Sequence, residues 1–63
     1  GVVNVNTADA TSLDALPGVG PVLAQRIVEW REKNGRFSSV DELGEVSGIG
    51  DKMLDRLRSK VTV

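Results

Sequence analysis

Hydrophobic residues recur three and four positions apart along most of the chain, which is the spacing of a buried helix face. In the first such segment, Ala10, Leu13 and Leu16 share one face. Asn6 or Thr7 precedes this face and is suited to cap a helix N-terminus. The pattern therefore predicts a short helix that ends near Leu16.

A longer helix is predicted after a sharp break in the pattern. Pro17 and Gly18 end the first helix, because proline cannot continue a helix and glycine readily adopts the left-handed exit conformation. Pro21 suits the first turn of the next helix, where its missing N–H is not needed. The apolar stripe of this second helix comprises Leu23, Ala24, Ile27, Val28 and Trp30, and Asn34-Gly35 ends it.

The same arrangement is repeated thirty residues later. Leu16-Pro17-Gly18-Val19-Gly20 aligns with Val46-Ser47-Gly48-Ile49-Gly50. The offset also pairs Leu13 with Leu43, Leu23 with Met53, Ala24 with Leu54, Arg26 with Arg56 and Ile27 with Leu57. A register of this length indicates a duplicated structural unit.

In the second copy, Ser39 and Glu42 have the spacing of a capping box in which Ser39 is the N-cap. It begins a short helix over about residues 40–46, and a last helix covers about residues 51–59. The β-prone residues at the two ends of the chain are too few to build a sheet. Because the segment between the copies is brief, we expect residues 1–63 to form one all-α domain of four to five short helices in two pseudo-symmetric hairpin units.

Composition excludes most chemistry. The 63 residues contain no cysteine and no histidine, so there is no disulfide, no thiolate ligand and no imidazole base. No serine has a recognisable base beside it, so we expect no catalytic residues and no enzyme activity. Asp41, Glu42 and Glu45 lack a hard-cation loop, and no metal site is expected. Trp30 and Phe37 are the only aromatic residues, which argues against a base-stacking surface. Trp30 is expected to be in the core or half-buried.

The distribution of charge is more informative than its sum. A net charge of −1 argues mildly against a nucleic-acid partner. Residues 1–25 and 37–50 are acidic, however, whereas residues 26–36 and 51–63 are basic. Basic residues are thus present in the second helix of each copy.

The two Gly-hydrophobic-Gly turns have the properties of anion sites. Glycines allow a sharp bend and a close approach to the backbone, and the first amides of the following helix have no intrahelical acceptor. The helix dipole adds partial positive charge at the same place. We therefore expect phosphate groups at these turns, with Val19 and Ile49 pointing inward. The candidate DNA-binding residues are Gly18, Val19, Gly20, Val22, Arg26, Gly48, Ile49, Gly50, Lys52 and Arg56.

The basic side chains differ in their expected contribution to phosphate binding. Lys52, in the first turn of the last helix, is the best single candidate for a phosphate contact. Arg26 and Arg56 could flank the sites, or could equally pair with neighbouring acids such as Glu29 and Asp55. Arg31, Lys33, Arg36, Arg58 and Lys60 are expected to add a diffuse positive field.

The two turns resemble the helix-hairpin-helix motif of DNA-binding proteins that do not read sequence. The Asn6-Thr7-Ala8 start and the Asn34-Gly35-Arg36-Phe37 linker narrow the resemblance to ComEA-like competence DNA receptors, over nearly all of residues 4–60. This resemblance implies capture of double-stranded DNA outside the cytoplasmic membrane and transfer to a membrane DNA-translocation channel. It also implies an anchor or signal N-terminal to the domain. The start at Gly1, without an initiator methionine, fits a fragment of a longer chain.

One position departs from the family pattern, which often has a lysine two residues after the second glycine of the first hairpin. Val22 occupies that position here, whereas its counterpart is Lys52. The second hairpin is therefore expected to be the stronger phosphate site. The resemblance also leaves open a monovalent cation at the hairpin carbonyls, and no other cofactor is expected.

Two alternatives remain open from the sequence. The domain could be a protein-interaction or structural module that has kept the fold and lost DNA binding, which the acidic balance and Val22 favour. It could also target a larger enzyme to DNA, since nucleases, ligases and polymerases carry similar hairpins. The intact glycines of both turns and Lys52 favour DNA binding.

Overall fold

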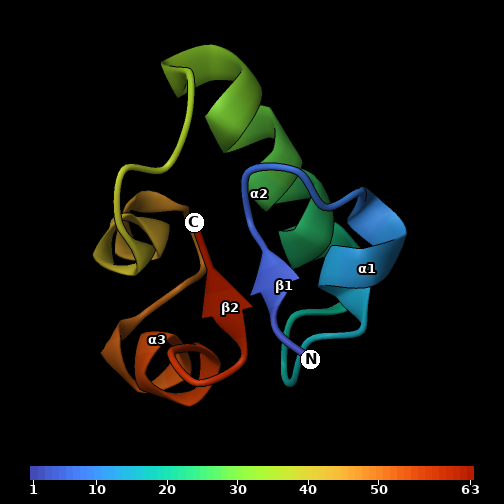
Figure 1. Cartoon of the computed structure of the whole chain (residues 1–63), viewed down its shortest axis with the longest axis vertical. Helices are drawn as coiled ribbons and strands as arrows, with labels where there is room; N and C mark the ends of the chain where they lie inside the picture. The colour runs from blue at the N-terminus through green and yellow to red at the C-terminus, as the bar shows by residue number, and fades with distance from the viewer.

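Two helical hairpins on either side of a short strand pair make up the computed structural model, which describes residues 1–63 (Figure 1). In chain order, the elements are β1 (Val3–Asn4), α1 (Ala10–Asp14), α2 (Gly20–Asn34), the 3₁₀ helix η1 (Val40–Glu45), α3 (Asp51–Leu57) and β2 (Val61–Thr62). Figure 1 shows α1 on one side of the strand pair and α3 on the other. The four predicted helices are confirmed, and the last ends two residues earlier than expected.

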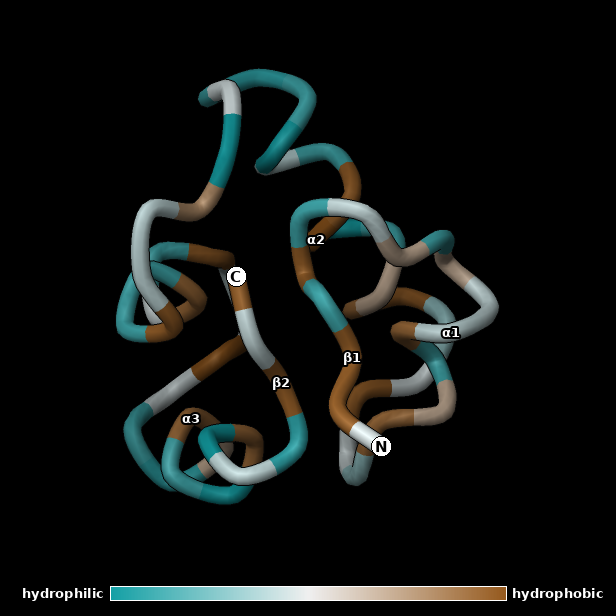
Figure 2. The backbone as a smooth tube through the Cα atoms, viewed as in Figure 1, coloured by the Kyte–Doolittle hydropathy of each residue, from teal (hydrophilic) through white to brown (hydrophobic).

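The core follows the thirty-residue repeat. Matched positions are buried in both copies: Leu13 and Leu43, Leu16 and Val46, Val19 and Ile49, Ala24 and Leu54, Ile27 and Leu57. Every buried residue is hydrophobic. Figure 2 shows hydrophobic segments along both strands, whereas the far end of α2, at the top of the view, is hydrophilic. The repeat in sequence is therefore a repeat in packing, and the two copies share one core.

The strand pair corrects the prediction that the β-prone ends are too short to build a sheet, in a fold that is otherwise helical as predicted. β1 and β2 pair in parallel with Val3 opposite Val61, although each strand has only two residues. The Val3 amide donates to the Lys60 carbonyl and the Val5 amide to the Thr62 carbonyl, both at 2.9 Å. Such short strands cannot stand alone, but buried Val5 and Val61 anchor them to the core. The pairing ties the two ends of the chain together.

One predicted helix cap is wrong, and the other forms only in part: Ser39 does occupy the N-cap position of η1. Asp9, rather than Asn6 or Thr7, caps α1, where its carboxylate accepts a hydrogen bond from the Ser12 amide at 2.9 Å. This hydrogen bond lowers the pKa of Asp9 below its usual value. At the start of η1, Ser39 makes no side-chain cap. Glu42 reaches back instead to the amide of the preceding residue, Ser38, so that only half of the expected capping box forms, one position earlier.

Asn6 and Phe37 join the start of the chain to the linker between the two copies. The Asn6 side chain donates to the Phe37 carbonyl at 3.0 Å and accepts from the Phe37 amide at 2.7 Å. The fully buried Phe37 ring stacks on half-buried Trp30, with centroids 4.3 Å apart and planes 12° apart. The predicted packing of Trp30 is confirmed. These residues hold the linker between the copies against the N-terminal segment.

Asn6→Ala is expected to lower the free energy of unfolding by about 1–3 kcal/mol, because it leaves the Phe37 amide and carbonyl without partners in a partly buried site. Urea denaturation followed by circular dichroism measures the loss. Asn34→Ala is the control, since the Asn34 side chain bonds only the Trp30 carbonyl one turn earlier on an exposed face. Equal unfolding midpoints for the two variants would contradict a linking role for Asn6.

Candidate nucleic-acid interface

The two hairpin turns are built alike. The Val19 amide donates to the Leu16 carbonyl at 3.1 Å, and the Ile49 amide donates to the Val46 carbonyl at 3.0 Å. Val19 and Ile49 are 6% and 5% exposed, so they point inward and hold each turn to the core, as predicted. The first glycine of each turn has a positive φ, 76° at Gly18 and 101° at Gly48, as the exit from the preceding helix requires.

The second glycines of the two turns are not equivalent. Gly20 has a φ of 70°, which favours glycine. Gly50 has a φ of −95° and a ψ of −178°, an extended conformation that any residue adopts. A Cβ placed on Gly50 would meet no atom within 4 Å. Glycine at position 50 is therefore not required by the fold, and the space beside it is open.

The helices that follow the turns begin without side-chain caps. Val19 precedes α2 and Gly50 precedes α3, and neither makes a side-chain capping hydrogen bond, whereas α1 is capped by Asp9. The first amides of α2 and α3 therefore have no side-chain acceptor and remain available to an external one. Pro21 removes one donor from the first turn of α2. The second hairpin thus offers more main-chain donors than the first.

Some of the basic side chains form ion pairs in the structure, and others form none. Lys52 and Arg56 are exposed and form no ion pair. Asp51 lies in the same first turn of α3 as Lys52, so Lys52 offsets a carboxylate beside the hairpin. Arg56 does not pair with Asp55, and Arg26 does not pair with Glu29, so that alternative is wrong for both arginines.

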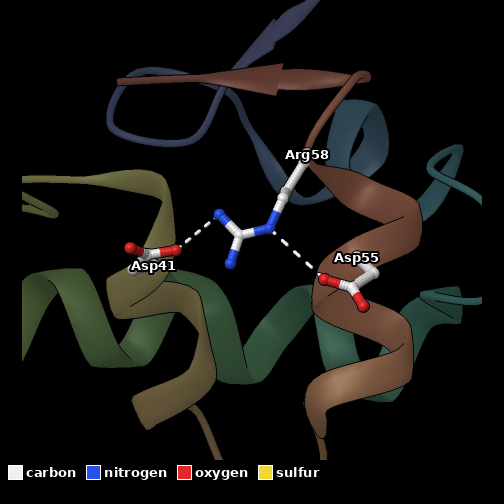
Figure 3. Close-up of polar contacts among 3 residues, drawn as sticks. All are labelled: Asp41, Asp55 and Arg58. Carbon is white, nitrogen blue, oxygen red and sulfur yellow. Dashed lines mark hydrogen bonds and ion pairs between the residues drawn. The ribbon is translucent and has the colours of Figure 1, made fainter.

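Arg58 is the basic residue that forms ion pairs with acidic side chains. Its guanidinium lies between Asp41 of η1 and Asp55 of α3, at 2.5 and 3.4 Å (Figure 3). Hydrogen bonds to Asp41 and then Asp55 raise the pKa of Arg58 above its usual value. All three side chains are exposed, so the contribution to stability is small. Arg58 therefore adds little to the positive field predicted from its charge.

The sequence did not reveal the contact made by Arg26. Its Nη1 donates to the carbonyl of Ser47, in the second hairpin, at 3.2 Å. Only the packing of α2 beside the second hairpin brings these residues together, and no spacing in the sequence signals it. Val22, by contrast, lies in the first turn of α2 as predicted, and it is 66% exposed. It lines an open depression that Arg26 also lines.

No three acidic, histidine or cysteine side chains gather where they could hold a metal ion. None of the helices combines the length and the apolar character needed to cross a membrane.

Two Gly-hydrophobic-Gly turns at matched places in the repeat, each leading into a helix without a side-chain cap, define a tandem helix-hairpin-helix protein. Residues 1–62 match the helix-hairpin-helix motif family, and the chain belongs to that family. It is 44% identical over 62 residues to ComE operon protein 1 of Bacillus subtilis. The matched region is 98% of this chain and 30% of that protein. These matches confirm a ComEA-like domain and support DNA binding as its role.

The same domain is present in proteins of different design. The chain is 40% identical over 60 residues to an uncharacterized protein of Haemophilus influenzae, of which it spans 54%. It is 41% identical over 61 residues to endonuclease/exonuclease/phosphatase family domain-containing protein 1 of Homo sapiens, of which it spans only 11%. About nine-tenths of the human protein therefore lies outside the match, and its enzymatic name describes that longer chain.

Proposed function

We propose that this domain binds double-stranded DNA through the phosphate backbone, with one hairpin on each strand and no reading of base sequence. The observation that carries the proposal is the pair of uncapped helix starts at Gly20 and Gly50–Asp51, related by the thirty-residue repeat. Two anion sites related by a pseudo-twofold axis match the twofold symmetry of the two antiparallel strands. Contacts of this kind position a protein on DNA and carry no sequence information.

Lys52 provides the main side-chain attraction at the stronger hairpin. Its ammonium group is free of ion pairs and lies in the first turn of α3, where it reinforces the partial charge of the amides. Because each neutralised phosphate releases counterions, the affinity is expected to fall steeply as salt increases.

The similarity to ComE operon protein 1 of Bacillus subtilis supports a proposal for the biological setting. We place the domain in DNA capture during competence, on the outer side of the cytoplasmic membrane, where it would pass duplex DNA to a membrane translocation channel. In this setting the domain is one part of a longer protein.

A monovalent cation at the hairpin carbonyls is a separate proposal, and the residues fit it only in part. The Ser47 carbonyl of the second hairpin already accepts a hydrogen bond from the Arg26 guanidinium, whose positive charge would repel a cation bound at that carbonyl. No side chain bonds the matched Pro17 carbonyl in the first hairpin.

Lys52→Glu tests the proposal. This variant is expected to weaken binding to all duplexes alike, by roughly tenfold or 1.4 kcal/mol. The salt slope, which is the slope of log affinity against log salt concentration, is expected to fall by the amount that corresponds to about one phosphate contact. The measurement is a fluorescence-anisotropy titration of two unrelated labelled duplexes over a series of salt concentrations. Lys33→Glu, which makes the same charge change at the far end of α2, is the control and is expected to have a smaller effect.

A change of sequence preference in Lys52→Glu would contradict backbone recognition. Absence of binding by the unaltered domain at low salt would favour the protein-interaction alternative instead.

Val22→Lys is expected to strengthen duplex binding and to raise the salt slope by about one phosphate, because it gives the first hairpin the lysine that the second already has. Val2→Lys is a matched control. Val2 and Val22 are the two exposed large hydrophobic residues, at 60% and 66%, and only Val22 lies at a hairpin. The same titration compares them, and equal gains in the two variants would mean that net charge, rather than the hairpin, determines affinity.

A further inference from the structure

The second hairpin is held by a side chain from the other half of the molecule. Arg26 projects from α2, and its Nη1 donates to the Ser47 carbonyl at 3.2 Å. A Cβ built on Gly48 would lie 3.0 Å from this Nη1 and 2.9 Å from Cδ1 of Leu23. Arg26 and Leu23, one turn apart on α2, are therefore packed directly against the backbone of the turn.

The first hairpin has only half of this support. A Cβ built on Gly18 would meet Met53, the counterpart of Leu23, at a relaxed 3.5 Å. Arg56, the counterpart of Arg26, makes no hydrogen bond to the first turn. The apolar contact thus follows the repeat, whereas the arginine contact exists on one side only.

The arginine contact orients a peptide group. In a planar trans peptide the C=O and the following N–H point in opposite directions. Holding the Ser47 carbonyl toward Arg26 therefore turns the Gly48 N–H away from Arg26. Because the donor is a cation, this hydrogen bond is stronger than one between neutral groups.

We propose that Arg26 is a positioning residue, which sets the main chain of the second hairpin for the phosphate, and that Arg56 is the arginine that contacts phosphate directly. The proposal rests on the DNA-binding function proposed above. A turn that is already ordered loses less entropy when the ligand binds, so affinity depends on Arg26 without a contact between Arg26 and DNA. The second hairpin is the one that also carries Lys52, so positioning and charge act at the same site.

Arg26→Gln and Arg56→Gln separate the two roles, because each removes one positive charge from matched places in the repeat. The first readout needs no DNA: amide hydrogen exchange at Ile49, whose amide closes the second turn, relative to Val19, whose amide closes the first. Arg26→Gln is expected to speed exchange at Ile49 relative to Val19 several-fold, and Arg56→Gln to leave the ratio unchanged. An unchanged ratio in Arg26→Gln would overturn the positioning role.

The second readout is the salt dependence of duplex binding. Arg26→Gln is expected to weaken binding with the slope of the unaltered protein, whereas Arg56→Gln lowers the slope by about one phosphate. A lowered slope in Arg26→Gln equal to that in Arg56→Gln would make Arg26 a phosphate ligand and refute the proposal. If the unaltered domain binds no duplex at low salt, the proposed function fails, while the exchange ratio still decides whether Arg26 positions the turn.

Discussion

Gly48→Ala is expected to destabilise the protein by about 2–4 kcal/mol, which is a large part of the stability of so small a domain. Two costs add at this position. A φ of 101° lies outside the range that alanine adopts without strain, and the added Cβ would come within 3.0 Å of both Leu23 and Arg26. Urea denaturation followed by circular dichroism measures the sum.

Gly18→Ala is the matched control, because it shares the positive φ and lacks the collision. Its φ is 76°, and its Cβ would meet only the flexible end of Met53 at 3.5 Å. The expected loss is about 1–2 kcal/mol, from the backbone alone. Adding Leu23→Ala to Gly48→Ala should recover part of the collision cost, so that the double variant loses less than the sum of the two single losses. Equal losses for Gly48→Ala and Gly18→Ala would show that the packing of α2 against the second turn is not tight.

Gly50→Val is expected to reduce DNA affinity by at least tenfold, or 1.4 kcal/mol, while the protein stays folded. The extended backbone at Gly50 suits valine, and the added side chain points into open space. Valine is a poorer residue than glycine before a helix, so a cost of up to about 1 kcal/mol in stability is expected. The side chain would occupy the space through which a phosphate reaches the first amides of α3.

Gly1→Val provides the control for an added exposed valine, since Gly1 also has nothing within 4 Å. Gly20→Val provides the contrast, because a φ of 70° makes that substitution damage the fold as well. Anisotropy titration and urea denaturation of the same samples separate the two effects. Normal DNA binding by folded Gly50→Val would rule out the main-chain amide mechanism.

The duplicated parts of the molecule were the predictable ones. The helix periodicity and the aligned glycines located both hairpins, and the inward positions of Val19 and Ile49 followed from their place between glycines. These features depend on local residue spacing. Because the chain contains two copies of the same spacing, the interpretation of one copy can be checked against the other.

Features that depend on contacts between distant segments could not be predicted. The strand pair joins residues 58 positions apart, and four residues carry no periodicity to detect. The Arg26–Ser47 contact and the different backbone of Gly20 and Gly50 likewise break the repeat. The cap of α1 was missed for another reason: several polar residues near the helix start could accept the same hydrogen bond, and the chain path selects Asp9. Glu42 reaches back as predicted, but to the amide of Ser38 rather than to that of Ser39.

Backbone amide chemical shifts of the nitrogen-15-labelled domain, followed during titration with a random-sequence duplex, test the central claim most directly. The account predicts that the largest changes fall on two groups of amides thirty residues apart, around Gly18–Val22 and Gly48–Lys52, and that a second duplex of unrelated sequence shifts the same amides. Saturable binding whose changes fall instead on η1 or on the strand pair, with both hairpins unaffected, would contradict it.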